Sequence, residues 1–122
     1  IFNLHGGDPQ KYRGLDTNLW AIWHRDFKSI GICMHVLNEK LDDGDIFQNH
    51  NVKIMKNMKL EELRSYITDY CVEMTKNLVT LNKNGNRIIC NSQKQIGRYY
   101  SHMPSELKLV CTEIFKKYVS EF

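Results

Sequence analysis

Three polar side chains in the first half of the chain could together form an acid–base site. Asn3 and His5 lie two residues apart at the end of an apolar run, so they would project the same way from a strand. Further along, Asp42 begins an Asp-Asp-Gly turn. An Asn amide can donate to an oxygen that gains negative charge, and a His can give or relay a proton. A nearby carboxylate orients the imidazole and favours its charged form.

This set of groups fits acyl transfer through a tetrahedral intermediate. No Ser or Cys lies close in the motif, so we expect no protein nucleophile. The same residues also have simpler interpretations. An Asn-x-His pair at a strand end is more often structural, and a lone Asp-x-Gly is usually only a turn. The argument therefore depends on the surrounding pattern.

The elements that would position these groups follow from the hydrophobic pattern. Residues 1–5 are typical of the end of a strand, and a polar loop follows over 6–14. A helix is predicted from Asp16 or Thr17 to about Arg25, capped by one of those two residues. The branched residues of 30–37 predict a strand buried on both faces, and 45–55 predicts another strand after the turn.

The second half of the chain has two predicted helices. Apolar residues spaced three and four apart indicate a helix over 59–81, which ends at the turn signal Asn84-Gly85. Residues 87–90 could form a short strand or an extended connector. A final helix opens at 101–104, with an inner stripe of Leu107, Val110, Cys111, Ile114, Phe115 and Tyr118.

Composition excludes several classes of protein. With 42% hydrophobic and 25% charged residues among 122, the chain is typical of one soluble globular domain or a piece of one. The net charge of +3 comes from scattered Lys residues, which does not make a nucleic-acid footprint. No stretch is long and apolar enough to span a membrane, and the first residues do not form a signal peptide. We expect a cytoplasmic protein.

The cysteines and histidines predict neither disulfides nor a metal site. The four cysteines are far apart in sequence, and we expect them to be reduced thiols, largely buried. The histidines lack metal-ligand spacing. Trp20 and Trp23, with Tyr12, could line a binding wall, but core packing is the commoner role. Arg13 could clamp a phosphate or carboxylate, or simply hold its loop.

The combined motifs resemble the folate-dependent formyltransferases, which include methionyl-tRNA, glycinamide ribonucleotide and sugar N-formyltransferases. The resemblance is carried by Asn3-Leu4-His5, Lys11-Tyr12-Arg13-Gly14 and Leu41-Asp42-Asp43-Gly44-Asp45-Ile46, in the same order and separation. The strand sequence 29–36 is also similar. Residues 97–104, Gly-Arg-Tyr-Tyr-Ser-His-Met-Pro, resemble a segment of some sugar N-formyltransferases.

The resemblance implies a fold and a set of roles. The fold would be α/β and Rossmann-like, a parallel sheet with helices on both faces. The chain would supply the C-terminal half of the sheet, and the family's earlier strands would precede Ile1. Residues 1–95 would then be the catalytic half of the domain and 96–122 a helical segment packed on it. One sheet edge would be left open unless another segment covers it.

The implied site residues fall into three groups. Asn3 and His5 would polarise the formyl oxygen of 10-formyltetrahydrofolate, and Asp42 would keep His5 charged and manage the proton lost by the amine. Asn3 and the loop Asn38, Glu39, Lys40, Leu41 and Asp42 would contact this cosubstrate. Gly7, Asp8 and Arg13 would bind the substrate that accepts the formyl group. In this loop the family's Ser-Leu-Leu-Pro is replaced by Gly7-Asp8-Pro9-Gln10.

The resemblance implies transfer of a formyl group to a primary amine, and residues 97–104 favour an amino sugar carried on a nucleotide. Three alternatives remain open at this point. Transfer to methionyl-tRNA would call for a basic RNA-binding extension, which these residues do not contain. Hydrolysis of formyltetrahydrofolate would use the same Asn, His and Asp. A catalytically incomplete fragment could bind folate or a partner without turnover.

Overall fold

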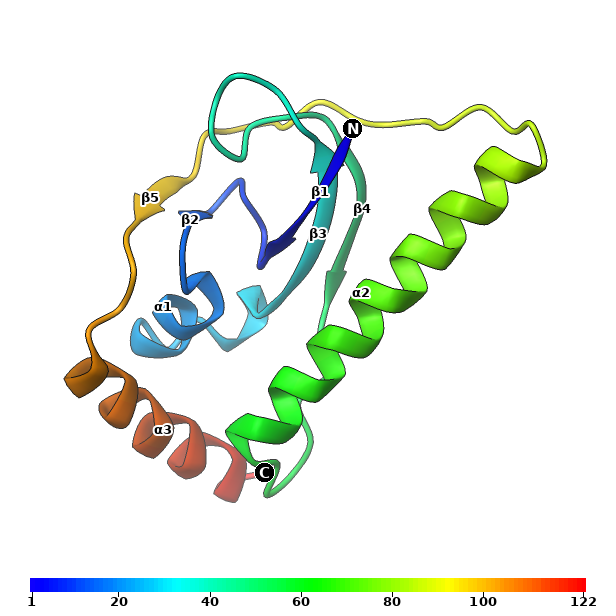
Figure 1. Cartoon of the computed structure of the whole chain (residues 1–122). Helices are drawn as coiled ribbons and strands as arrows, with labels where there is room; N and C mark the ends of the chain where they lie inside the picture. Colours follow the sequence, from blue (N-terminus) through cyan, green and yellow to red (C-terminus); the bar gives the residue numbers. More distant parts are fainter.

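The computed structural model describes residues 1–122 and shows a small sheet with helices on both sides (Figure 1). The elements, in chain order, are β1 (Phe2–Gly6), β2 (Tyr12–Gly14), α1 (Thr17–Trp23), a 3-10 turn (Phe27–Ser29), β3 (Gly31–Val36), β4 (Ile46–Asn51), α2 (Leu60–Lys83), β5 (Arg98–Tyr100) and α3 (Ser105–Ser120). The α/β class and the principal elements predicted from the sequence are confirmed.

The main sheet has three strands in the order β1-β3-β4. Both pairings are antiparallel, so the parallel arrangement implied by the family resemblance is wrong for these strands. For β3 and β4 the reason is local: they follow each other through the loop that contains Asp42, and strands joined in this way pair as a hairpin. β1 pairs with β3 alone, so it forms an edge of the sheet.

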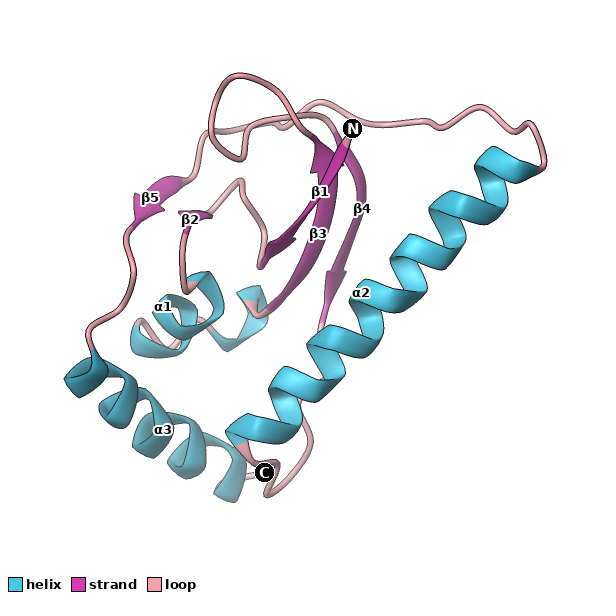
Figure 2. Ribbon diagram, in the orientation of Figure 1, coloured by secondary structure: helices cyan, strands magenta, loops and turns pink.

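The two faces of β3 contact different parts of the molecule. Ile32 and Met34 point to the long helix α2, where they pack on Met74. On this side α2 runs the length of the sheet (Figure 2). Cys33 and His35 alternate with them and face the other way, opposite His5 and Asn3 in the register. Because both faces are covered, β3 is buried from Gly31 to His35, as its apolar sequence predicts.

The larger core lies where the three helices meet. Ile22 of α1, Leu63 of α2 and Phe115 of α3 are almost fully buried there, together with Ile30 at the start of β3. Trp20 and Trp23 pack against this core, which confirms their expected core role. The Trp20 indole N–H also donates to the Ser101 carbonyl oxygen at 2.8 Å, which ties α1 to the segment before α3.

Several boundaries differ from those predicted. β4 ends at Asn51 rather than Met55, and residues 87–90 form a connector. The stripe of α3 is displaced, because Val110 is 44% exposed while Val119 is buried. The three-residue strands β2 and β5, which pair in parallel, have no signal in the hydrophobic pattern. The division of the chain into a catalytic half (residues 1–95) and a helical segment (residues 96–122) stays a prediction.

No helix in the structure has the length and hydropathy needed to cross a membrane. All four cysteines are free: Cys33 and Cys111 are buried, and Cys71 and Cys90 are half-buried. Burial, expected for the cysteines, is therefore complete at two of the four positions, and their reduced state stays a prediction.

The buried contacts of α3 predict a large loss of stability for Phe115→Ala. Phe115 is 1% exposed, and truncating a buried Phe costs about 3–5 kcal/mol in the free energy of unfolding. Leu109→Ala on the same helix is the matched control, because Leu109 is 71% exposed and its loss should cost less than about 0.5 kcal/mol. Urea unfolding measures both values. Equal losses would contradict the observed orientation of α3.

Candidate functional site

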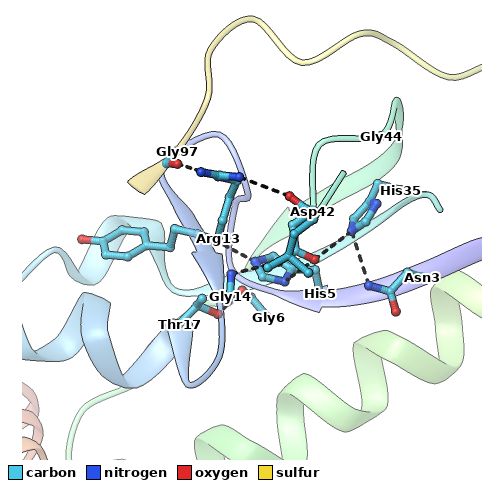
Figure 3. Close-up of polar contacts among 12 residues, drawn as sticks. Asn3, His5, Gly6, Arg13, Gly14, Thr17, His35, Asp42, Gly44 and Gly97 are labelled. Carbon is cyan, nitrogen blue, oxygen red and sulfur yellow. Dashed lines mark hydrogen bonds and ion pairs between the residues drawn. The ribbon is translucent and has the colours of Figure 1, made fainter. Parts of the chain in front are cut away.

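The Asp42 carboxylate is buried between two histidines (Figure 3). Its Oδ1 lies 3.5 Å from Nδ1 of His5 and 3.6 Å from Nε2 of His35. The two imidazole rings meet edge to face, with centroids 6.2 Å apart. These three side chains are each less than a tenth exposed, so they interact in an environment from which most water is excluded.

The backbone holds Asp42 in an unusual conformation. Its φ is 55°, in the left-handed region that non-glycine residues rarely adopt and that costs about 1 kcal/mol or more. The Gly14 N–H donates to Oδ2 of Asp42 at 2.8 Å, so the second carboxylate oxygen, which does not face the histidine nitrogens at Oδ1, is also held. Gly44 completes the turn: a Cβ there would lie 1.7 Å from the Val36 carbonyl oxygen. Only glycine fits that approach.

His5 has an acceptor at each ring nitrogen. Its Nε2 lies 2.7 Å from the Tyr12 carbonyl oxygen, which can only accept, so Nε2 carries a proton. Its Nδ1 faces the Asp42 carboxylate. When both nitrogens are protonated, each N–H therefore has a partner within the chain. The observed conformation satisfies an imidazolium and leaves neither N–H directed at an external oxygen.

Asn3 and His35 form a second pair across the β1–β3 register. Asn3 Nδ2 lies 3.4 Å from His35 Nε2, while His35 Nδ1 lies 3.0 Å from the Val36 carbonyl oxygen. In neutral His35 a proton on Nδ1 leaves Nε2 as the acceptor for one N–H of the Asn3 amide, whereas a protonated Nε2 donates toward the Asp42 carboxylate instead. The other amide N–H stays available. Asn3, His5 and Asp42 are thus brought together as predicted.

Sequence reasoning misses the involvement of His35, which it places only in the predicted strand 30–37 and among the histidines that lack metal-ligand spacing. The signal that could have found it is its position in β3. It shares strand parity with Cys33, and a hairpin register with Asn3 opposite it places both on one face. That register exists only because β1 and β3 pair antiparallel, so a predicted parallel sheet does not place His35 opposite Asn3.

A hollow of about 730 Å³ opens beside these groups. Asn3, His5 and Asp42 all line it, together with Leu41 and Tyr99. Residues of α2 also line it: Leu60, Leu63, Arg64, Ile67 and Thr68. The volume lies within the range of sites for small molecules, and the wall combines apolar surface with a few polar groups.

The loop expected to contact the cosubstrate lies partly away from this hollow. Leu41 and Asp42 line it, but Asn38, Glu39 and Lys40 are exposed and do not. Asn38 Oδ1 instead accepts the Lys40 backbone N–H at 3.1 Å, which closes a local turn. Cosubstrate contacts from residues 38–40 stay a prediction.

Gly7, Asp8 and Arg13, the residues expected to bind the acceptor, all form hydrogen bonds within the chain. The Asp8 carboxylate accepts the Gln10 backbone N–H at 2.9 Å, and Gly7, with φ of 78°, donates its N–H to the Gly31 carbonyl. Arg13 donates from Nε to the Gly97 carbonyl at 2.6 Å, and from its terminal nitrogen to the Leu41 carbonyl at 3.4 Å. These contacts favour the loop-holding role that was left open for Arg13.

The buried Cys33 thiol is not placed to act as a nucleophile. Burial, reinforced by the carboxylates of Asp8 and Asp42, raises its pKa to about 12. The thiolate is the reactive form of cysteine, so little of it exists near neutral pH. Burial and a hydrogen bond to Asp26 likewise raise the pKa of the Tyr12 hydroxyl. No group of three or more His, Cys, Asp or Glu side chains has an arrangement that could hold a metal ion.

Comparison with known proteins links this geometry to one family. The model of the formyl transferase family matches residues 1–79, which include β1, the Asp42 turn and most of α2. The bifunctional polymyxin resistance protein ArnA of Wigglesworthia glossinidia brevipalpis is 30% identical over 85 residues, covering 67% of this chain and 13% of ArnA.

Two solved structures share the fold. The formyltransferase PseJ from Anoxybacillus kamchatkensis, in complex with UDP-4,6-dideoxy-4-formamido-L-AltNAc and tetrahydrofolate, superposes with a TM-score of 0.68 at 24% identity, over 82% of this chain and 51% of PseJ. HypX from Aquifex aeolicus, in complex with tetrahydrofolic acid, gives a TM-score of 0.64 at 19% identity, over 94% of this chain and 22% of HypX.

The chain spans about an eighth of ArnA and about half or less of the two structural relatives. The family match nevertheless extends over more than half of the chain and contains all three polar groups from which the site was predicted. On that evidence the chain belongs to the formyl transferase family.

Proposed function

We propose that this chain carries the catalytic groups of an N-formyltransferase that moves a formyl group from 10-formyltetrahydrofolate to a primary amine. The observation that supports this most strongly is the meeting of Asn3, His5 and Asp42 at one wall of the hollow. Both structural relatives described above hold tetrahydrofolate, which supports a folate cosubstrate.

The proposed reaction needs no protein nucleophile. The amine nitrogen attacks the formyl carbon, the new C–N bond forms, and the carbonyl oxygen becomes an oxyanion. The free N–H of Asn3 and an N–H of His5 would stabilise that oxyanion. The bond to N10 of the folate then breaks. The amine loses one proton and N10 gains one, and the Asp42–His5 pair would transfer it; the 3.5 Å contact between the two side chains supports this role.

The resting position of His5 sets a condition on this mechanism. Its Nε2–H is held by the Tyr12 carbonyl, so it has to leave that acceptor before it can donate to a substrate oxygen. A rotation of the ring accomplishes this while the Asp42 carboxylate stays close. Catalytic hydrogen bonds commonly form only in the complex with substrate.

For the acceptor, we infer an amino sugar carried on a nucleotide. PseJ was solved with a nucleotide-linked formamido sugar, and the scattered positive charge of this chain makes no strong RNA-binding face. The alternatives are methionyl-tRNA as acceptor, hydrolysis with water as acceptor, and folate or partner binding without turnover.

A turnover assay separates these alternatives. The full-length natural polypeptide that contains this chain is incubated with 10-formyltetrahydrofolate and a panel of nucleotide-linked amino sugars, and tetrahydrofolate release is followed. We expect release that depends on one of the amines. Release without any amine would identify a hydrolase, and folate binding without release would contradict catalysis.

Replacing Asn3 by Ala should lower kcat roughly 100- to 1,000-fold, because one oxyanion donor is removed. Tetrahydrofolate affinity, measured by calorimetry, should change far less. Asn49→Ala on β4 is the matched control, since Asn49 is exposed and does not line the hollow. A fully active Asn3→Ala enzyme would remove Asn3 from the site.

Replacing His5 by Ala should lower kcat roughly 100- to 10,000-fold, because it removes both a donor and the route for the proton. His50→Ala, at an exposed position of β4, should keep the normal rate. Steady-state kinetics of tetrahydrofolate release measure both variants. If His5→Ala works at a near-normal rate, the assigned mechanism is wrong.

A further inference from the structure

The long connection between α2 and β5 reaches back to the turn that contains Asp42. Residues 91–97, which we call the strap, cross the end of the sheet before the chain enters β5 (Figure 1). The match to the formyl transferase family ends at residue 79, so the strap lies outside it.

The strap is attached to the sheet and to the loop after β1. Asn91 exchanges two backbone hydrogen bonds with Ile46 at the start of β4, at 2.7 and 2.8 Å. The Lys94 N–H donates to the side-chain oxygen of Gln10 at 2.7 Å. At its end, Gly97 passes so close to the loop that a Cβ would lie 2.4 Å from the Pro9 carbonyl oxygen, and its own carbonyl accepts from Arg13.

Between these attachments, Gln93 holds both ends of the Asp42 turn. Its Nε2 donates to the Asp42 carbonyl at 2.9 Å and to the Gly44 carbonyl at 3.0 Å. Carbonyl oxygens only accept, so the amide nitrogen must face them, and its two hydrogens are both used. The other amide atom, Oε1, is buried without a partner. The side chain is therefore orientated by the two bonds to the turn.

From these contacts we infer that Gln93 is a positioning residue, which fixes the left-handed Asp42 turn and through it the direction of the Asp42 carboxylate. This inference rests on the proposed function for its catalytic consequence. Asp42 has a left-handed backbone conformation, which a residue other than glycine keeps only when the surrounding structure enforces it. Gly14 restrains the side chain of Asp42, and Gln93 restrains its backbone.

The test uses Gln93→Glu in the full-length natural polypeptide, because Glu has nearly the shape of Gln. At neutral pH it has no N–H to donate, and its carboxylate would face two carbonyl oxygens. We expect kcat to fall roughly 10- to 100-fold while the KM for the folate stays nearly constant, as for a displaced catalytic group. Gln95→Ala, at an exposed position of the same strap, should leave both constants unchanged.

A second measurement does not depend on turnover. The Gly14 amide donates to the Asp42 carboxylate, so its hydrogen exchange reports where that carboxylate points. Gly14 also lies far from residue 93 in sequence. Gln93→Glu should accelerate exchange at Gly14, while the Leu15 amide, bonded to the Tyr100 carbonyl, keeps its protection.

The outcomes are distinguishable. A wild-type protein without turnover would refute the proposed function, and exchange at Gly14 would still decide whether Gln93 fixes the carboxylate. Unchanged protection at Gly14 would overturn the inference, and so would a Gln93→Glu enzyme with the normal kcat. Loss of protection at Gly14 and Leu15 together would show general unfolding and would also overturn it.

Discussion

The site depends on one constraint, the placement of a buried carboxylate in a strained turn. Asp42 combines a left-handed backbone with a side chain that touches two histidines and a backbone N–H. Each of these contacts requires another part of the chain to be in position. Gly14 comes from β2, His5 from β1 and His35 from β3. A carboxylate buried without such partners would be strongly destabilising, so the contacts that form the site also stabilise the fold.

The antiparallel register of β1 and β3 gives the site its shape. It sets Asn3 opposite His35 and His5 opposite Cys33, so one face of two neighbouring strands carries the side chains of the candidate site. The other face of β3 packs on α2 through Ile32 and Met34. A shift of one residue in this register would exchange the two faces. The apolar packing on α2 therefore determines which side chains meet Asp42.

The sequence was sufficient to predict that Asn3, His5 and Asp42 would meet, and to predict the main helices, since both are local signals. Asn3, His5 and the Asp42 turn are a motif, and the 3.6-residue period of α2 is visible within that segment alone. What was missed depends on contacts between distant segments. The strand direction, the role of His35, and the pairing of β2 with β5 follow from tertiary pairing. The same holds for Gln93, whose partners lie about fifty residues earlier in the chain.

The central claim is that Asn3 and His5 together bind the oxygen of a formyl group. A crystal structure of the full-length natural polypeptide with a stable analogue of 10-formyltetrahydrofolate tests it most directly. The account predicts the formyl oxygen within hydrogen-bond distance of Asn3 Nδ2 and of a His5 ring nitrogen, with the His5–Tyr12 bond broken and Asp42 still beside the ring. An analogue bound elsewhere, or a His5 that remains on the Tyr12 carbonyl while the formyl group occupies the hollow, would contradict it.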